Sequence, residues 1–122
     1  MDKELEDSLV KKYNYMFDEK ETFSFSCDDG WYDLIDIALL KIKKADTTKE
    51  FRILQIKEKY GMLCLYGNRE NKKIQDIVSK AEDVSLKICE ICGKDACLCV
   101  KGMWYKTLCQ TCREKYGYKI AS

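Results

Sequence analysis

The 122-residue chain contains no histidine and no proline. Without histidine it cannot form a Ser-His-Asp or Cys-His nucleophile system, use an imidazole as a general acid or base, or bind a metal through an imidazole nitrogen. Any bound metal must therefore be held by sulfur or oxygen ligands. Average usage predicts about six prolines in a chain of this length, and the sequence offers no physical reason for their absence.

The sequence also lacks segments that would direct it to a membrane or out of the cell. The first seven residues are acidic and carry neither the basic nor the apolar stretch of a secretory signal peptide. No apolar run approaches the length of a transmembrane helix. We therefore expect a cytoplasmic protein without membrane contact. Its eight cysteines should stay reduced and serve as metal ligands or buried thiols rather than disulfides.

What the chain does have is ample apolar content and an uneven charge. Apolar residues make up 46% and charged residues 35%, which suits a folded, soluble domain. Residues 1–36 carry a net charge of −7, residues 37–88 carry +5 and residues 89–122 carry +3. This distribution predicts surfaces of opposite potential or self-complementary contacts, although solvated surface charge is the simpler interpretation.

The spacing of apolar residues predicts three amphipathic helices with strands between them. Helices are expected where apolar residues recur every three or four positions, over residues 3–20, 30–44 and 69–88. Strands are expected where apolar and polar residues alternate, over residues 22–27, 51–58 and 62–66. The last two strands should form a hairpin that turns at Gly61. Together these elements predict an α+β domain, a small sheet with amphipathic helices, over residues 1–88.

Two cysteine pairs near the C-terminus have the spacing of a zinc site. Cys89 and Cys92 are followed, after sixteen intervening residues, by Cys109 and Cys112, which gives C-x2-C-x16-C-x2-C. Two residues between cysteines let one tight turn aim both sulfurs at a single metal, and two such pairs complete a tetrahedron. Iron–sulfur clusters use the same ligands, but the paired spacing favours one zinc ion. Four protein ligands leave no open position for substrate, so the metal is expected to be structural.

The residues around these pairs predict a treble-clef-like zinc finger. Two short strands are expected between the pairs, at residues 96–100 and 103–108, with a turn at Lys101-Gly102. A helix carrying the second pair in its first turn should follow and end at Gly117. This order of knuckle, hairpin and helix is what resembles a treble clef.

The predicted finger, residues 89–122, is too short to carry a core of its own. We expect it to fold around the metal and to pack on the preceding α+β domain. Cys97 and Cys99 lie between the ligand pairs and point to the same side of a strand. They could be a redox-sensitive pair, substitute ligands or ordinary strand residues, and the last is the simplest interpretation. Cys27 and Cys64 are expected to be core residues.

The finger is also basic and aromatic, which raises nucleic-acid binding as an alternative. Its net charge of +3 could meet phosphates, while aromatic side chains could stack on bases. The aromatic residues that interleave with the basic ones are Trp104, Tyr105, Tyr116 and Tyr118. Trp104 and Tyr105 could instead be buried against the helix predicted over residues 69–88, which would fix the finger to the main domain.

A metal-dependent nuclease is the third interpretation. Gln55 and Lys57 on a predicted strand invite comparison with nuclease cores, in which Gln or Glu two residues before a Lys lies beside a metal. Such a site also needs carboxylates to bind Mg²⁺. The candidates are Asp28, Asp29, Asp33 and Asp36. They fall in a loop and on a helix rather than on the preceding strand, which favours an ordinary strand with a polar outer face.

Several motifs together resemble a family of small, functionally uncharacterised proteins from bacteria and their phages. The motifs are Asp29-Gly30-Trp31 at a helix start, a hairpin reading QIKEKYG-x-L-x-x-Y from Gln55 to Tyr66, Ala81-Glu82 with Ser85, and a Cys-x-x-Cys-Gly knuckle. The resemblance implies a phage or prophage association and an accessory, anti-defence or anti-CRISPR-like role. It brings no established activity. The chain departs from the family pattern at Cys64, Cys97 and Cys99.

We therefore expect a non-enzymatic, zinc-binding interaction protein that binds, and inhibits, a host or defence-system protein in a bacterial or phage-infected cell. The acidic amino-terminal region or the hairpin face would bind this partner, and the candidate surface residues come from the hairpin motif and the finger. These residues are Gln55, Lys57, Glu58, Lys59, Trp104 and Tyr105.

Overall fold

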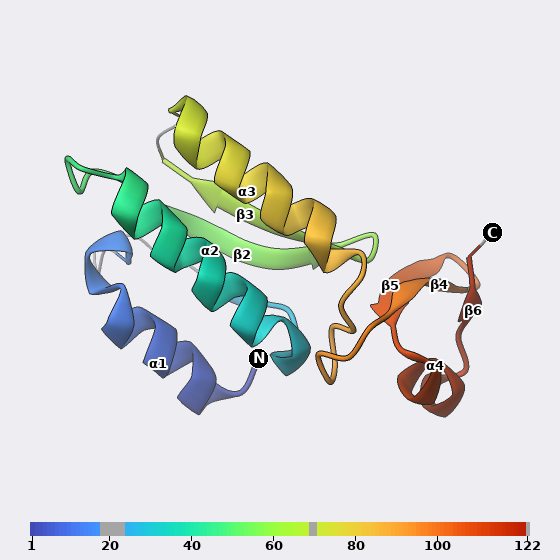
Figure 1. Cartoon of the computed structure of the whole chain (residues 1–122). Coiled ribbons are helices and arrows are strands. Elements are labelled where there is room, and N and C mark those ends of the chain that lie inside the picture. The colour runs from blue at the N-terminus through green and yellow to red at the C-terminus, as the bar shows by residue number, and fades with distance from the viewer. Residues whose placement is uncertain (18–23, 69–70, 122) are drawn as a thin grey trace.

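The computed structural model of the chain describes residues 1–17, 24–68 and 71–121 (Figure 1). These residues form four α-helices and two three-stranded sheets, the predicted α+β class. In this part of the chain, no helix combines the length and the apolar character needed to cross a membrane. Parts of the strand predicted over 22–27 and of the helices predicted over 3–20 and 69–88 lie outside the described residues.

The first helix, α1 (Lys3–Lys12), ends well before the predicted position 20. A short 3-10 turn, η1 (Asn14–Met16), follows it. Asn14 explains the early end, because asparagine competes with helical hydrogen bonding and favours turns. The turn still buries the apolar residues that suggested a longer helix, namely Tyr13, Met16 and Phe17.

The two longest helices, of 14 residues each, cover the first sheet. A 3-10 turn, η2 (Asp29–Trp31), leads into α2 (Tyr32–Ala45), as the spacing predicted. All six residues of the predicted apolar stripe are buried: Trp31, Leu34, Ile35, Ala38, Leu39 and Ile42. The third helix, α3 (Lys72–Ser85), begins at Asn71, whose side chain accepts a hydrogen bond from the Ile74 N–H at 2.9 Å. It ends three residues earlier than predicted, and the chain then turns towards the finger.

The first sheet has the strand order β1–β2–β3. Its strands are β1 (Ser24–Ser26), β2 (Ile53–Lys59) and β3 (Met62–Gly67). β1 runs parallel to β2, and β2 and β3 form the predicted antiparallel hairpin. The loop is Tyr60-Gly61, with φ of +52° and +84°. A two-residue loop with both φ angles positive is a type I′ turn, which matches the twist of the paired strands.

The sheet has one covered face and one open face. Phe25, Ile56 and Leu65 lie opposite one another on the three neighbouring strands and pack with the helices in the main core. Figure 1 shows α1, α2 and α3 gathered on this side of the sheet. Because side chains alternate along a strand, Gln55 and Lys57 lie on the opposite, open face.

The helix α3 also covers the free edge of β3. The backbone N–H of Leu63 donates to the Ser85 hydroxyl at 2.9 Å, and that of Leu65 donates to the Glu82 carboxylate at 3.1 Å. These N–H groups point away from β2 and would otherwise be free to pair with another chain. Two polar residues of the resemblance motif therefore have a structural role.

The two isolated cysteines, Cys27 and Cys64, are buried, with 5% and 7% of their surface exposed. Cys27 belongs to the main core, whereas Cys64 pairs with Lys57 on the open face of the sheet. Burial raises the pKa of both thiols, to about 12 for Cys27. Both therefore stay protonated and act as packing residues, as predicted.

The second sheet and the last helix form the finger. In chain order its elements are β4 (Cys97–Lys101), β5 (Trp104–Leu108), α4 (Gln110–Tyr116) and β6 (Lys119–Ile120), with the strand order β5–β4–β6. The hairpin turns at Gly102-Met103, one residue later than predicted, because Lys101 still pairs with Trp104. The helix ends at Gly117 with φ of +75°, as predicted. The two-residue β6 was not predicted, since so short a strand shows no alternation.

Candidate metal centre

The structure brings together the four cysteines that the spacing singled out: Cys89, Cys92, Cys109 and Cys112. Their Sγ atoms all lie within 4.8 Å of one another, and those of Cys92 and Cys109 are 3.5 Å apart. Four sulfurs placed tetrahedrally about 2.3 Å from a zinc ion would be separated by about 3.8 Å. The four thiols could therefore hold one metal ion, and this ligand set is consistent with zinc.

The first ligand pair lies in a tight turn. The Cys89 N–H donates to the Lys94 carbonyl at 2.8 Å, and the Gly93 N–H donates to the Cys89 carbonyl at 2.9 Å. Gly93 has a φ of +83°, in the region that residues with a side chain rarely adopt. The glycine after the second cysteine thus allows the chain to fold back, so that both sulfurs face the same point.

The second ligand pair lies at the start of α4. Cys109 directly precedes the helix, and Cys112 lies in its first turn. A hydrogen bond from the Cys112 backbone N–H lowers the pKa of Cys109 to about 7, which favours the thiolate form that binds metals. Burial raises the pKa of Cys112 to about 12, so a bound cation would displace a proton from this thiol.

Cys97 and Cys99 lie beside the centre but outside the group of four sulfurs. Cys99 is fully buried and packs with Cys89 and Cys109. Cys97 is half-buried, and its Sγ lies 3.9 Å from a guanidinium nitrogen of Arg113. These contacts fit the simplest of the three interpretations, that of ordinary strand residues.

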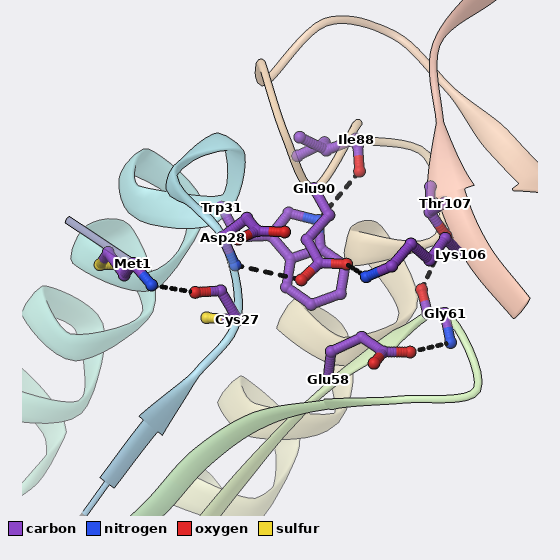
Figure 2. A network of polar contacts seen from close by, with 10 residues as sticks. All are labelled: Met1, Cys27, Asp28, Trp31, Glu58, Gly61, Ile88, Glu90, Lys106 and Thr107. Carbon is purple, nitrogen blue, oxygen red and sulfur yellow. Dashed lines mark hydrogen bonds and ion pairs between the residues drawn. The ribbon is translucent and has the colours of Figure 1, made fainter. Parts of the chain in front are cut away.

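A buried glutamate between the first two ligands ties the finger to the rest of the chain (Figure 2). Glu90 is 2% exposed, and its carboxylate accepts hydrogen bonds from the Asp28 N–H at 3.0 Å and from Lys106 Nζ at 3.2 Å. Its backbone N–H donates to the Thr107 carbonyl at 3.0 Å, and its carbonyl accepts from the Gly30 N–H at 2.7 Å. Burial raises the pKa of Glu90, while the ammonium group of Lys106 opposes this shift.

The Asp29-Gly30-Trp31 motif forms the other side of this contact. A Cβ atom at Gly30 would lie 2.1 Å from the carbonyl oxygen of Cys89, so only glycine permits the observed approach. The indole N–H of the fully buried Trp31 donates to the Ile88 carbonyl at 2.9 Å. The motif therefore packs directly against the backbone that carries the first metal ligand.

The hairpin turn of the first sheet makes a second contact with the finger. The Thr107 hydroxyl donates to the Gly61 carbonyl at 2.7 Å, and a Cβ atom at Gly61 would lie 2.5 Å from a methyl carbon of Leu98. The Gly61 N–H in turn donates to the Glu58 carboxylate at 2.7 Å. Glu58, which the sequence suggested as a partner-binding residue, thus also has a structural role at this junction.

The other suggested partner-binding residues fall on two separate surfaces. Gln55, Lys57 and Lys59 lie on the open face of the first sheet. Trp104 and Tyr105 lie on the finger and are 74% and 40% exposed. The alternative that these two aromatic residues are buried against α3 is therefore wrong. They begin β5, an edge strand, and the polar contacts of Glu90 and Thr107 fix the finger in place of aromatic packing.

The residues of the hypothetical nuclease site are not brought together. Asp33 lies on α2 beside α3, on the helical side of the sheet, whereas Gln55 and Lys57 lie on the open side. Asp36 is bound by a lysine of α1 at 2.8 Å, and Asp28 belongs to the contact with the finger. Within residues 1–17, 24–68 and 71–121, the four cysteines are the only group of this kind that could hold a metal.

The chain matches no family model, no curated protein and no solved structure. Its function is therefore inferred from the residues and contacts described above. The sequence singled out neither Glu90 nor Thr107, although both hold the finger in place. The only signal that could have indicated Glu90 is the placement of an acidic residue between two cysteine ligands.

Proposed function

We propose that this protein is a non-enzymatic, zinc-binding interaction protein that binds another protein through its finger. The four cysteines would hold one structural zinc ion, since they fill all four positions of a tetrahedral site. The compact group of Sγ atoms and the glycine-dependent turn after Cys92 support this assignment. The ion would keep the finger folded, because the second sheet and α4 enclose only a small core.

The observation that carries the binding role is a run of three consecutive exposed apolar residues, here called the hairpin tip: Met103, Trp104 and Tyr105. These residues are 91%, 74% and 40% exposed. Single exposed apolar residues are common on soluble proteins, whereas three exposed apolar residues in succession are typical of a functional surface. Methionine, tryptophan and tyrosine are enriched in protein interfaces, and tryptophan often contributes most of the binding energy.

The contacts that the basic side chains of the finger make within the chain favour a protein partner over a nucleic acid. Lys106 is paired with Glu90, Lys101 Nζ donates to the Tyr116 carbonyl at 3.0 Å, and Arg113 contacts the Cys97 sulfur. Half of the six basic side chains of the finger are thus engaged within the chain. The ion pair with Glu90 neutralises Lys106, and the contacts of Lys101 and Arg113 hold their side chains against the finger, which leaves fewer free cations to meet phosphates.

The biological setting is part of the same proposal. We infer a phage or prophage protein, of the bacterial and phage family described above, that inhibits a host or defence-system protein in the cytoplasm. The support for this part is the motif resemblance alone. If it is correct, expression of the chain in bacteria that carry the relevant defence system should restore the plating efficiency of a sensitive phage. Unchanged plating across the defence systems of its host would contradict the inhibitory role.

Affinity capture from a bacterial lysate, followed by purification of the captured protein, tests the binding role. We expect one stoichiometric protein partner whose capture survives nuclease treatment. Trp104→Ala should weaken binding of the purified partner by about tenfold or more, because a central tryptophan anchors such interfaces, while leaving the zinc content unchanged. Leu54→Ala is the matched control, since Leu54 is 40% exposed on β2, away from the hairpin tip.

Two outcomes would redirect the proposal. Loss of partner binding on Lys57→Ala but not on Trp104→Ala would move the binding surface to the open face of the first sheet. Salt-dependent binding to DNA or RNA, without any captured protein, would support the nucleic-acid alternative instead.

A further inference from the structure

A groove lined by apolar side chains runs between α2 and α3, which lie side by side and antiparallel (Figure 1). Its volume is about 450 Å³. The buried small residues Ala38 and Ala81 form its floor, and Ile77 and Val84 of α3 form one wall. The other wall is Ile37 of α2, which is 53% exposed. The groove therefore has enough volume for a side chain from another helix.

The exposed side of α2 carries charges that would pair with those of a second copy of the same helix running in the opposite direction. Asp33, Ile37 and Lys41 are spaced four residues apart and so lie along one line of the helix. The line has an acidic end, an apolar centre and a basic end. Within the described residues, neither Asp33 nor Lys41 forms an ion pair that would neutralise it. Leu40, 43% exposed, adds apolar surface beside the centre.

We propose that two copies of this chain form a symmetric dimer through this face, with α2 packed antiparallel against α2. A two-fold axis at Ile37 would place Asp33 of each copy against Lys41 of the other. The two Ile37 side chains would meet at the axis, between the grooves that Ala38 and Ala81 line in each copy. The dipoles of the two antiparallel helices would also attract each other. This inference is independent of the proposed function, because the hairpin tip lies on the finger.

The size of the face predicts a weak, concentration-dependent dimer. α2 and α3 have 14 residues each and are therefore about 21 Å long. A contact made by such a pair of helices falls at the small end of specific interfaces, about 600 Å² per partner or less. We expect dissociation constants in the micromolar range.

Sedimentation equilibrium of the full zinc-loaded chain, from about 1 µM to about 1 mM, tests the dimer. The average mass should rise with concentration, and Ile37→Asp should raise the dissociation constant by about tenfold or more, because it buries a charge at the axis. Ile120→Asp is the matched control: Ile120 is 58% exposed on β6 and should leave the dissociation constant unchanged. Circular dichroism should show the same fold for both variants, since both positions are exposed.

Charge reversal distinguishes a two-fold dimer from any other association. Asp33→Lys and Lys41→Asp should each weaken self-association by about fivefold, because each places like charges together at both ends. A mixture of the two variants should associate more tightly than either alone, since every pair across the axis is then of opposite sign. A monomer at every concentration, or a mixture no tighter than its components, would overturn the proposal.

Discussion

Replacing Gly30 by alanine should detach the finger from the helical part of the molecule. The Cβ atom of the new side chain would lie 2.1 Å from the Cys89 carbonyl oxygen and 2.5 Å from the Glu90 carbonyl oxygen. Both obstacles are backbone atoms, so no side-chain rotation can relieve the contact. The chain must move apart at the point where the Asp29-Gly30-Trp31 motif meets the first metal ligand.

The expected loss follows from the hydrogen bonds that cross this contact. Three of them join residues 28–31 to residues 88–90: Gly30 N–H to Glu90 O at 2.7 Å, Trp31 Nε1–H to Ile88 O at 2.9 Å, and Asp28 N–H to the Glu90 carboxylate at 3.0 Å. At about 1 kcal/mol each, their loss amounts to about 3 kcal/mol. Alanine restricts the unfolded chain and returns about 0.4–1 kcal/mol, because Gly30 does not require a positive φ. The free energy of unfolding should therefore fall by about 2–3 kcal/mol.

Urea unfolding followed by the fluorescence of Trp31 measures this loss. Trp104 is the only other tryptophan, so a Trp104→Phe background isolates the signal. Gly30→Ala should lower the unfolding midpoint and shift the Trp31 emission to longer wavelength before unfolding begins. Gly102→Ala is the control: Gly102 has φ of +60°, and a Cβ atom there would meet nothing within 4 Å. It should lose about 1 kcal/mol from backbone strain, with unchanged Trp31 emission.

One result would refute the reasoning. If Gly30→Ala loses no more stability than Gly102→Ala and leaves the Trp31 emission unchanged, the finger does not depend on the close approach at Gly30.

Two other buried groups give further predictions. Lys106→Met should lower the free energy of unfolding by about 2–4 kcal/mol, because it leaves the Glu90 carboxylate unpaired. Glu90→Gln in the same chain should restore most of this stability. Additive losses in a double-mutant cycle would contradict the pairing of Lys106 with Glu90. Asp46 is 4% exposed and accepts hydrogen bonds from the Phe51 N–H and the Tyr15 hydroxyl, both at 3.0 Å. Burial opposes ionisation, yet these bonds lower the pKa of Asp46. Its stabilising effect is therefore present above the unfolded pKa of about 3.9 and is lost as the pH falls through the lower folded value. Asp46→Asn should lose about 1–2 kcal/mol at about pH 7 and little at about pH 2, measured by urea unfolding, whereas an equal loss at both pH values would contradict it.

The parts of the molecule that depend on local spacing could be predicted from the sequence. The apolar period of α2 identifies its buried residues, and the distances between cysteines identify the two pairs that converge. The turn at Gly61 follows from a glycine between two alternating segments. In each case the signal lies within a few residues of the feature that it predicts, or repeats at a fixed interval.

The junction between the finger and the rest of the chain could not be predicted in this way. Glu90 meets Asp28 across 62 positions of sequence, and Thr107 meets Gly61 across 46. No local pattern marks a polar residue that will be buried by a distant segment. The exposure of Trp104 has the same origin, because it depends on where the whole finger is held rather than on its own neighbours.

The structure also changes the interpretation of the resemblance motifs. Gly30 and Trp31 contact the finger, Gly61 contacts Thr107, and Ser85 binds the edge of β3. Residues that serve the architecture would recur in any relative that places a finger on the same helical layer. A shared motif of this kind therefore indicates a shared arrangement, and a shared partner must be sought on the exposed surfaces.

Native mass spectrometry of the full chain tests most directly whether the four cysteines hold one structural zinc ion. We predict about one zinc per chain, lost in Cys112→Ser and retained in Cys99→Ser, because only the first removes one of the four converging sulfurs. Two ions per chain, none, or loss of the ion in Cys99→Ser would contradict the account.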